Sequence, residues 1–260
     1  IMPSLVGSEM CIRDRNHSKN MGIGKSLNTT AFVSHYDFEL YSNFTFFLED
    51  PVNGDQIRQF EDRLMAGAKT VFQDNSANLG GMEFKYNAGV GFRYDNVDDN
   101  QLSRTLNRQE LLERLAFGDI DEMNGYAFAG ASFKTGKFTL EPALRMDYFR
   151  FDYNDKTSEL YDSRSEEKVA FSPKFNTIYS PTAKTQFFLK TGIGFHSNDT
   201  RVVVANGGED ILPAAYGVDF GTILKPADKL VLNATLWSLF LDQEFVYVGD
   251  AAIVEPSGKT

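Results

Sequence analysis

The sequence contains almost no cysteine. Cys11 is the only one among 260 residues, and it lies in the opening stretch IMPSLVGSEMCIRDR. This stretch resembles a read-through segment that recurs at the ends of assembled sequences, and it does not share the pattern of the rest of the chain. We therefore expect residues 1–20 to be an assembly artefact or a disordered leader without strand partners, and residues 21–260 to form the folded domain. With Cys11 set aside, a disulfide framework, a thiolate nucleophile and a cysteine-based metal site are excluded.

Long apolar runs, a signal peptide and an excess of positive charge are also absent. No stretch approaches the ~18 consecutive apolar residues of a membrane-spanning helix. Residues 1–15 lack the apolar core of a signal peptide, and their basic residues come at the wrong end. The net charge is −10 and no basic stripe occurs, which excludes nucleic acid as a partner.

Residues that usually carry chemistry are sparse. The histidines His17, His35 and His196 lie far apart in the sequence, and none has a partner at the spacing of metal ligands, so we expect no zinc-binding or catalytic role for them. No nucleophile or nucleotide motif stands out. The paired carboxylates of a soluble carbohydrate-cleaving enzyme are missing as well. The sequence therefore predicts a protein that is not an enzyme and has no cofactor.

Aromatic residues, in contrast, are abundant, with 23 Phe and 11 Tyr. Together with other apolar residues they recur at every second position, as in residues 82–94 (MEFKYNAGVGFRY), where apolar and polar side chains alternate without a break. This period of two is typical of a β-strand with one apolar and one polar face. Nine segments show it, at about 28–48, 61–74, 81–96, 122–134, 137–153, 167–180, 184–197, 214–225 and 228–248.

The connections between these segments alternate in length. Short connections (75–80, 135–136, 181–183 and 226–227) follow long ones (49–60, 97–121, 154–166, 198–213 and 249–260). Short turns at one end and long loops at the other are typical of outer-membrane β-barrels, whose strands need ~9–11 residues to cross the bilayer. We therefore predict an all-β, antiparallel up-and-down transmembrane β-barrel. The opposite faces of its strands should then meet lipid and a wet lumen.

The alternation assigns individual residues to the two sides. The aromatic residues expected to face lipid are Phe84, Tyr86, Phe92, Phe171, Phe187 and Tyr216. The charged residues expected to face the lumen are Arg93, Glu141, Arg145, Asp147, Asp242 and Glu244. In the acidic stretch DNVDDN, the carboxylates of Asp95, Asp98 and Asp99 are weak candidates for binding a cation, against the simpler interpretation of a solvated loop.

Aromatic clusters precede three of the long connections. Because amphipathic rings prefer the headgroup level of a membrane, we interpret each cluster as the end of a strand at the bilayer surface. The clusters are Phe44, Phe46 and Phe47; Tyr148, Phe149, Phe151 and Tyr153; and Phe245 and Tyr247. The aromatic core of a soluble barrel remains an alternative interpretation.

Two stretches resemble a known family. YSNFTFFLEDPVNGDQIRQFEDR (41–63) and the region 212–259, with its LW…LD…E…VYVGD run, are similar to parts of TonB-dependent receptors, the large plugged barrels of Gram-negative outer membranes. The resemblance covers about residues 28–260. It implies that the chain is an open fragment of about nine strands from a barrel of ~22 strands.

The resemblance also implies a function and partners. The parent receptor would take up a scarce ligand, such as an iron chelate, across the outer membrane. Its partners would be outer-membrane lipid, an extracellular small ligand, a plug domain and TonB, the last two through parts of the receptor outside this chain. A complete small outer-membrane barrel with a structural or adhesive role is the alternative.

Overall fold

The computed structural model describes residues 5–157, 162–197, 200–205, 211–243, 245–248 and 253–256. Nearly all of them are in β-strands. The strands of the main sheet are β1 (Leu5–Gly22), β2 (Lys25–Ser42), β3 (Ile57–Asp74), β4 (Asn78–Leu79), β5 (Met82–Leu106), β6 (Glu110–Thr135), β7 (Phe138–Asp155), β8 (Asp162–Thr182), β9 (Thr185–Phe195), β10 (Ala214–Ala227) and β11 (Leu230–Leu241).

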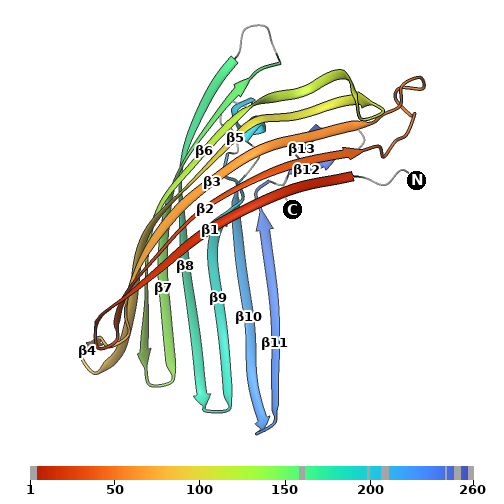
Figure 1. Ribbon diagram of the computed structural model, residues 1–260. Helices are drawn as coiled ribbons and strands as arrows, with labels where there is room; N and C mark the ends of the chain where they lie inside the picture. Colours follow the sequence, from red (N-terminus) through yellow and green to blue (C-terminus); the bar gives the residue numbers. More distant parts are fainter. Residues whose placement is uncertain are drawn as a thin grey trace.

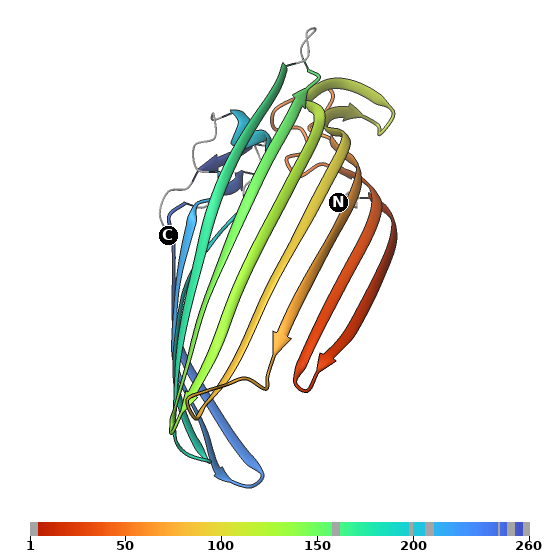
Figure 2. The same cartoon turned by 90° about the vertical axis from the view of Figure 1, so that its left-hand side faces the viewer.

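The main sheet is antiparallel and follows chain order. Its strands run β1-β2-β3-β5-β6-β7-β8-β9-β10-β11, and the short β4 pairs with β5 (Figure 1). A separate two-stranded sheet joins β12 (Phe245–Val248) to β13 (Ile253–Pro256). The predicted antiparallel up-and-down fold is confirmed, and the sheet is curved but not closed (Figure 2).

One short helix, α1 (Thr200–Ala205), lies in the connection between β9 and β10. Figures 1 and 2 show the sheet curved around the side on which α1 lies, which we call the concave face. Within the described residues, no helix has the length and apolar character needed to cross a membrane.

The expectation that residues 1–20 have no strand partner is wrong. Leu5 to Gly22 form β1, which pairs with β2 from Leu5 opposite Tyr41 to Gly22 opposite Lys25. The main path therefore has ten strands, one more than predicted. The N-terminal stretch lacks a clear apolar alternation, so its pairing comes from the backbone hydrogen bonds that the open edge of β2 offers to any extended chain.

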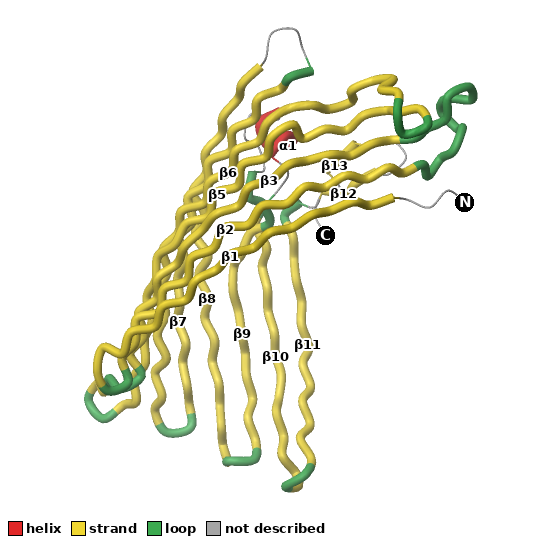
Figure 3. The backbone as a smooth tube through the Cα atoms, in the orientation of Figure 1, coloured by secondary structure: helices red, strands yellow, loops and turns green. Residues whose placement is uncertain are grey.

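Two connections also differ from the prediction. Most of the expected loop 97–121 is strand, because β5 continues to Leu106 and β6 begins at Glu110. The first predicted strand ends at Ser42 instead of continuing to residue 48. Short turns still gather at one end of the sheet (Figure 3). The other end carries the longer connections 43–56 and 196–213, together with the short turn 107–109 between β5 and β6. With 25 and 26 residues, β5 and β6 are far longer than the ~9–11 residues that cross a bilayer.

The pairing register divides the side chains between two faces. Arg93 of β5 lies opposite Asn124 of β6, which lies opposite Phe149 of β7. Side chains directly opposite one another point to the same side of a sheet, and Phe149 packs against the α1 segment, so this set belongs to the concave face. The alternate residues form the convex face, where large apolar side chains are widely exposed: Val90, Phe92, Leu144, Val169, Phe171, Val218 and Phe220.

Aromatic rings on the concave face lie over glycines of the neighbouring strand. A Cβ atom added to Gly89 would lie 2.6 Å from Cζ of Phe128 and 2.9 Å from the carbonyl oxygen of Thr70. The same arrangement joins Gly67 to Phe32, Gly91 to Tyr126 and Gly221 to Phe188. A ring that covers a glycine protects its bare backbone and fills the missing side-chain volume. These glycines therefore serve packing, not turns.

We expect Gly89→Ala to destabilise the sheet, because the added methyl group would collide with both Phe128 and the backbone of β3. Overpacking of this kind costs about 1–3 kcal/mol. The measurement is the denaturant midpoint of the longer protein predicted to contain this chain, in detergent micelles, followed by circular dichroism. Gly125→Ala is the matched control, since nothing lies within 4 Å of a Cβ there. Equal midpoints for both variants would contradict the packing role of Gly89.

The two outer strands generate a second prediction. In the described sheet, β1 and β11 each have one strand neighbour, so each leaves a row of backbone groups without a strand partner. Unsatisfied backbone groups cost several kcal/mol each in a hydrocarbon environment, and open edges promote aggregation. We expect the isolated chain, refolded in detergent, to show no compact band on an unheated gel. A compact band that shifts on heating and resists protease would instead indicate a closed barrel.

Candidate functional site

The concave face carries a series of arginine–carboxylate pairs. Arg145 contacts Asp147 through two hydrogen bonds, Nε to Oδ2 at 2.7 Å and Nη2 to Oδ1 at 2.6 Å. Asp147 is fully buried and also accepts a hydrogen bond from Nδ2 of Asn124 at 3.1 Å. The guanidinium of Arg145 lies 3.9 Å from the ring centre of Tyr126. The buried carboxylate is thus neutralised by the arginine two residues before it.

The same spacing recurs on β5 and β3. Arg93 contacts Asp95 with Nε to Oδ2 at 2.6 Å and Nη2 to Oδ1 at 2.8 Å. Arg63 contacts Glu61 at 3.1 Å, and the hydroxyl of Tyr36 donates to the same carboxylate. Residues two apart on a strand share a face, so an Arg and an acid at this spacing can form a pair within one strand. Arg-x-Asp is therefore a sequence signal for such pairs that our sequence analysis missed.

A cavity of about 810 Å³ opens on the concave face between β5 and β11. Polar side chains from five strands contribute to its lining: Asn87, Arg145, Asn176, Lys190 and Asp219. Lys190 lies 4.7 Å from the ring centre of Phe188, and Asn176 donates a hydrogen bond to Glu141 at 3.1 Å. The cavity therefore offers hydrogen-bond donors, acceptors and charges of both signs within a lining that is mostly apolar.

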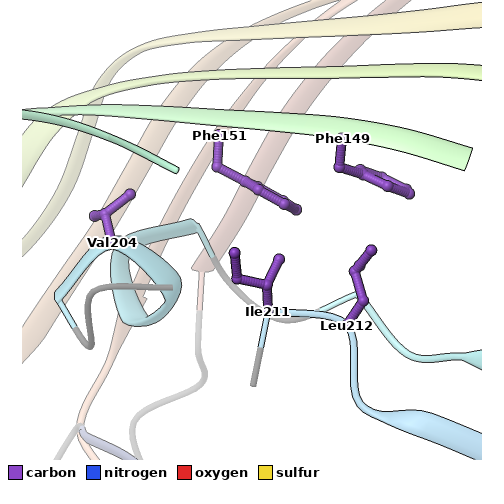
Figure 4. Packing of buried hydrophobic residues seen from close by; sticks show 5 residues of the cluster. All are labelled: Phe149, Phe151, Val204, Ile211 and Leu212. Carbon is purple, nitrogen blue, oxygen red and sulfur yellow. The ribbon is translucent and has the colours of Figure 1, made fainter. Parts of the chain in front are cut away.

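The segment around α1 folds onto the concave face near the long-connection end. Phe149 and Phe151 of β7 pack against Val204, Ile211 and Leu212, which come from α1 and the residues before β10 (Figure 4). This is the main buried apolar cluster in the described residues. Two polar contacts join the same segment to the sheet, from Thr200 Oγ1 to Glu122 at 3.4 Å and from Arg201 to Asn100 at 3.0 Å. The connection is therefore part of the concave surface.

Most of the residues singled out in the sequence lie on the two faces of the sheet to which the alternation assigns them. Arg93, Glu141, Arg145 and Asp147 lie on the concave face, by their register. Asp242 differs, because it accepts a hydrogen bond at 3.5 Å from Tyr216, a convex residue. Glu244 lies outside the described residues. The aromatic residues predicted to face lipid all have convex positions: Phe84, Tyr86, Phe92, Phe171, Phe187 and Tyr216.

The three carboxylates of the acidic stretch do not come together. Asp95 points to the concave face and is held by Arg93. Asp98 lies on the convex face, opposite Asp62 and next to a register shift. Asp99 has a φ of 52° and forms an ion pair with Lys156 at 3.0 Å. A shared cation site for these three is therefore not formed in the described structure.

Two of the three aromatic clusters are not exposed strand ends: one lies in a connection, and the other is partly buried. Phe44, Phe46 and Phe47 lie in the connection 43–56, beyond the end of β2 at Ser42. Phe149 and Phe151 are buried under the α1 segment. For Phe245 and Tyr247, the side chains lie outside what the structure describes. Alternation alone could not show which rings another segment covers.

The connection 43–56 is ordered around one carboxylate. Asp55 accepts backbone hydrogen bonds from Leu48 at 2.8 Å, Glu49 at 3.1 Å and Asp50 at 2.8 Å. Burial would raise the pKa of the Asp55 carboxyl, but the amides of Glu49, Asp50 and Leu48 outweigh this and hold the pKa below its ordinary value. Around this carboxylate the loop presents exposed apolar side chains: Phe44, Phe46, Phe47, Leu48 and Val52. The loop is thus a fixed apolar tip at the long-connection end.

A family model describes most of the chain. The model for the TonB dependent receptor-like β-barrel matches residues 13–255. The match begins within β1, before the point where our sequence-based boundary places the folded domain. No curated protein matches the chain in sequence.

Solved structures share the fold. The unliganded ferric citrate transporter FecA has a TM-score of 0.78 at 11% identity, over 91% of this chain and 35% of that one. The siderophore receptor PiuA from Acinetobacter baumannii has a TM-score of 0.75 at 12% identity, over 94% of this chain and 42% of that one. The copper transporter OprC has a TM-score of 0.69 at 14% identity, over 96% of this chain and 42% of that one. The chain therefore spans less than half the length of these structures.

The contacts of Asp55 predict how the loop 43–56 responds to substitution and pH. We expect Asp55→Asn to speed the hydrogen exchange of the Leu48, Glu49 and Asp50 amides at neutral pH, because a charged acceptor is lost. Since the folded pKa is lowered, the charged form supports the loop above the ordinary pKa of about 3.9. That support is lost as pH falls through the lowered value.

Hydrogen exchange measured by mass spectrometry checks this, with peptides covering residues 43–56. Asp228→Asn, a change at an exposed turn carboxylate, is the control. Unchanged protection in the Asp55 variant, or equal changes in both variants, would show that Asp55 does not order the loop.

Proposed function

This chain belongs to the TonB dependent receptor-like β-barrel family, and on that basis we propose that it is part of the barrel wall of an outer-membrane receptor that takes up a scarce ligand. In this proposal the convex face contacts outer-membrane lipid and the concave face borders the lumen. Lipid-facing residues would include Phe84, Tyr86, Phe92, Phe171, Phe187 and Tyr216. Lumen-facing charges would include Arg93, Glu141, Arg145 and Asp147.

The observation that carries this proposal is the asymmetry of the two faces. Large apolar side chains are left exposed across the convex face, with Phe171 60% and Phe220 56% exposed. A monomer in water rarely exposes a contiguous apolar surface of such extent, whereas a bilayer would cover it. The opposite face carries paired charges and a cavity to which charged and polar side chains contribute, which suit a wet lumen.

The similar structures support a metal-containing cargo. These proteins are named for ferric citrate, a siderophore and copper. We infer an iron chelate as the first candidate ligand class for the receptor that contains this chain. At 11–14% identity the likeness carries the fold, so the ligand belongs to the proposal.

The partners follow from the same inference. A plug domain would occupy the concave side, and TonB would act through parts of the receptor outside this chain. Uptake would be a property of the whole receptor, because this chain covers 35–42% of the length of the structures above. A complete small barrel with a structural or adhesive role is disfavoured by the open sheet.

The proposed orientation places the long connections outside the cell. We expect a cysteine at Val52, which is 84% exposed, to react with a membrane-impermeant thiol reagent on whole cells. A cysteine at Ala183, in the exposed turn between β8 and β9, should not react until the outer membrane is opened. Both are placed in the full receptor with Cys11→Ser, and labelling is measured on a gel.

The Cys11→Ser receptor without an introduced cysteine, treated with the same reagent, controls for background labelling. Labelling at Ala183 but not at Val52 would reverse the orientation. Labelling of both in intact cells would contradict a membrane-spanning sheet.

A further inference from the structure

Three metal-ligating side chains converge on the convex face, away from the concave surface described above. They are His35 and Asp37 of β2 and Asp62 of β3. One ligand atom from each lies within 4.8 Å of the other two. Among the described residues this is the one group of three or more histidine, cysteine or acidic side chains with that convergence.

Strand pairing brings these residues together. His35 and Asp37 are two apart on one strand and so share a face, and Asp62 lies directly opposite Asp37. The Nε2 atom of His35 lies 2.7 Å from Oδ1 of Asp62 and 3.9 Å from Oδ1 of Asp37. The three side chains are each about half exposed, at 46%, 47% and 45%. An ion could therefore reach them from solvent without any movement of the backbone.

The surrounding charge favours a cation at this place. Glu9, Asp37, Asp62 and Asp98 lie opposite one another in a row across β1, β2, β3 and β5. Like charges directly opposite on a sheet destabilise it. In the described part of the chain, Asp37 and Asp62 form ion pairs with His35 and with no lysine or arginine. A bound cation would relieve the repulsion within this row.

The cluster lies where the convex face changes character. One step toward the short turns, Val33, Ala66 and Tyr94 occupy one row. Beyond this row the convex positions carry His35, then Asp37 and Asp62. If the apolar region contacts lipid, the cluster lies just outside it, in the aqueous headgroup zone. That placement leaves the ligands hydrated and accessible.

We propose that His35, Asp37 and Asp62 bind a divalent transition-metal ion of the zinc class. One imidazole nitrogen and two carboxylate oxygens form the three-ligand set that leaves a fourth tetrahedral position for water. A nitrogen ligand favours zinc-class ions over calcium and magnesium, which prefer oxygen ligands throughout. Metal binding replaces the hydrogen bond between His35 and Asp62, and the imidazole must be neutral to coordinate.

This site departs from the sequence-based expectation that no histidine binds zinc. That expectation considered spacing along the chain, and Asp62 is 27 residues from His35. The register between β2 and β3 closes this gap. The inference rests on that register and not on the proposed transport function.

The test is a zinc titration of the untagged full receptor proposed to contain this chain, in detergent micelles, in competition with a chromophoric zinc indicator. The receptor carries Cys11→Ser, so that this thiol cannot account for binding. We expect it to bind one zinc ion more tightly than its His35→Gln and Asp62→Asn variants, by at least the factor of about ten that loss of an outer-shell partner already costs. Zinc-edge X-ray absorption of the loaded receptor should show a shell of nitrogen and oxygen ligands, with the imidazole signature lost in His35→Gln.

His17→Gln is the matched control, because His17 is another exposed histidine on the convex face, opposite Thr29 instead of an acid. The His17→Gln variant should bind as much zinc, with the same affinity, as the receptor without this substitution. Circular dichroism verifies that each variant keeps its strand content. No zinc binding by the receptor, or equal zinc stoichiometry and affinity in the receptor and in its His35→Gln and Asp62→Asn variants, would overturn the proposal. Because no step depends on uptake, failure here would leave the proposed function unaffected.

Discussion

Pairing of backbone hydrogen-bonding groups between neighbouring strands is the constraint on which the rest of this structure depends. Apart from the short β4, which pairs with β5 alone, each strand of the main sheet pairs with the next one along the chain, and the register is continuous over most of its length. Buried backbone groups must be satisfied, and in a hydrocarbon environment no water can replace a missing partner. The same requirement explains why even the N-terminal stretch, which lacks an apolar alternation, is paired along β2.

Because pairing fixes the register, it also fixes which side chains meet. On the concave face this produces two kinds of contact, charged pairs such as Arg145 with Asp147 and aromatic rings over glycines such as Phe128 over Gly89. The charged pairs allow buried carboxylates to remain neutralised. The ring–glycine contacts protect bare backbone next to polar residues. The convex face differs in its widely exposed apolar side chains, and its charged pairs, such as Arg150 with Asp152 and Lys25 with Asp74, lie toward the ends of the strands.

The long-connection end combines order with exposure. The α1 segment buries Phe149 and Phe151, while Asp55 holds the connection 43–56 in a fixed shape that presents several apolar side chains to solvent. A segment that is already ordered loses less conformational entropy when it binds a partner than a mobile segment does. The family model includes this end of the sheet together with the strands, since it matches residues 13–255.

The sequence by itself determined the strand alternation, the antiparallel up-and-down fold and the assignment of residues such as Phe92 and Arg93 to opposite faces, because side chains alternate with a period of two. The sequence pattern could not determine the structure of a segment where contact with a second, distant segment decides it. Residues 5–22 became a strand through the edge of β2, and Phe149 became buried under Ile211 and Leu212. Asp95 joined Arg93 and not Asp98, and His35 met Asp62 across a strand pair. Such contacts join residues far apart in sequence, so only the register and curvature of the folded sheet could bring them together.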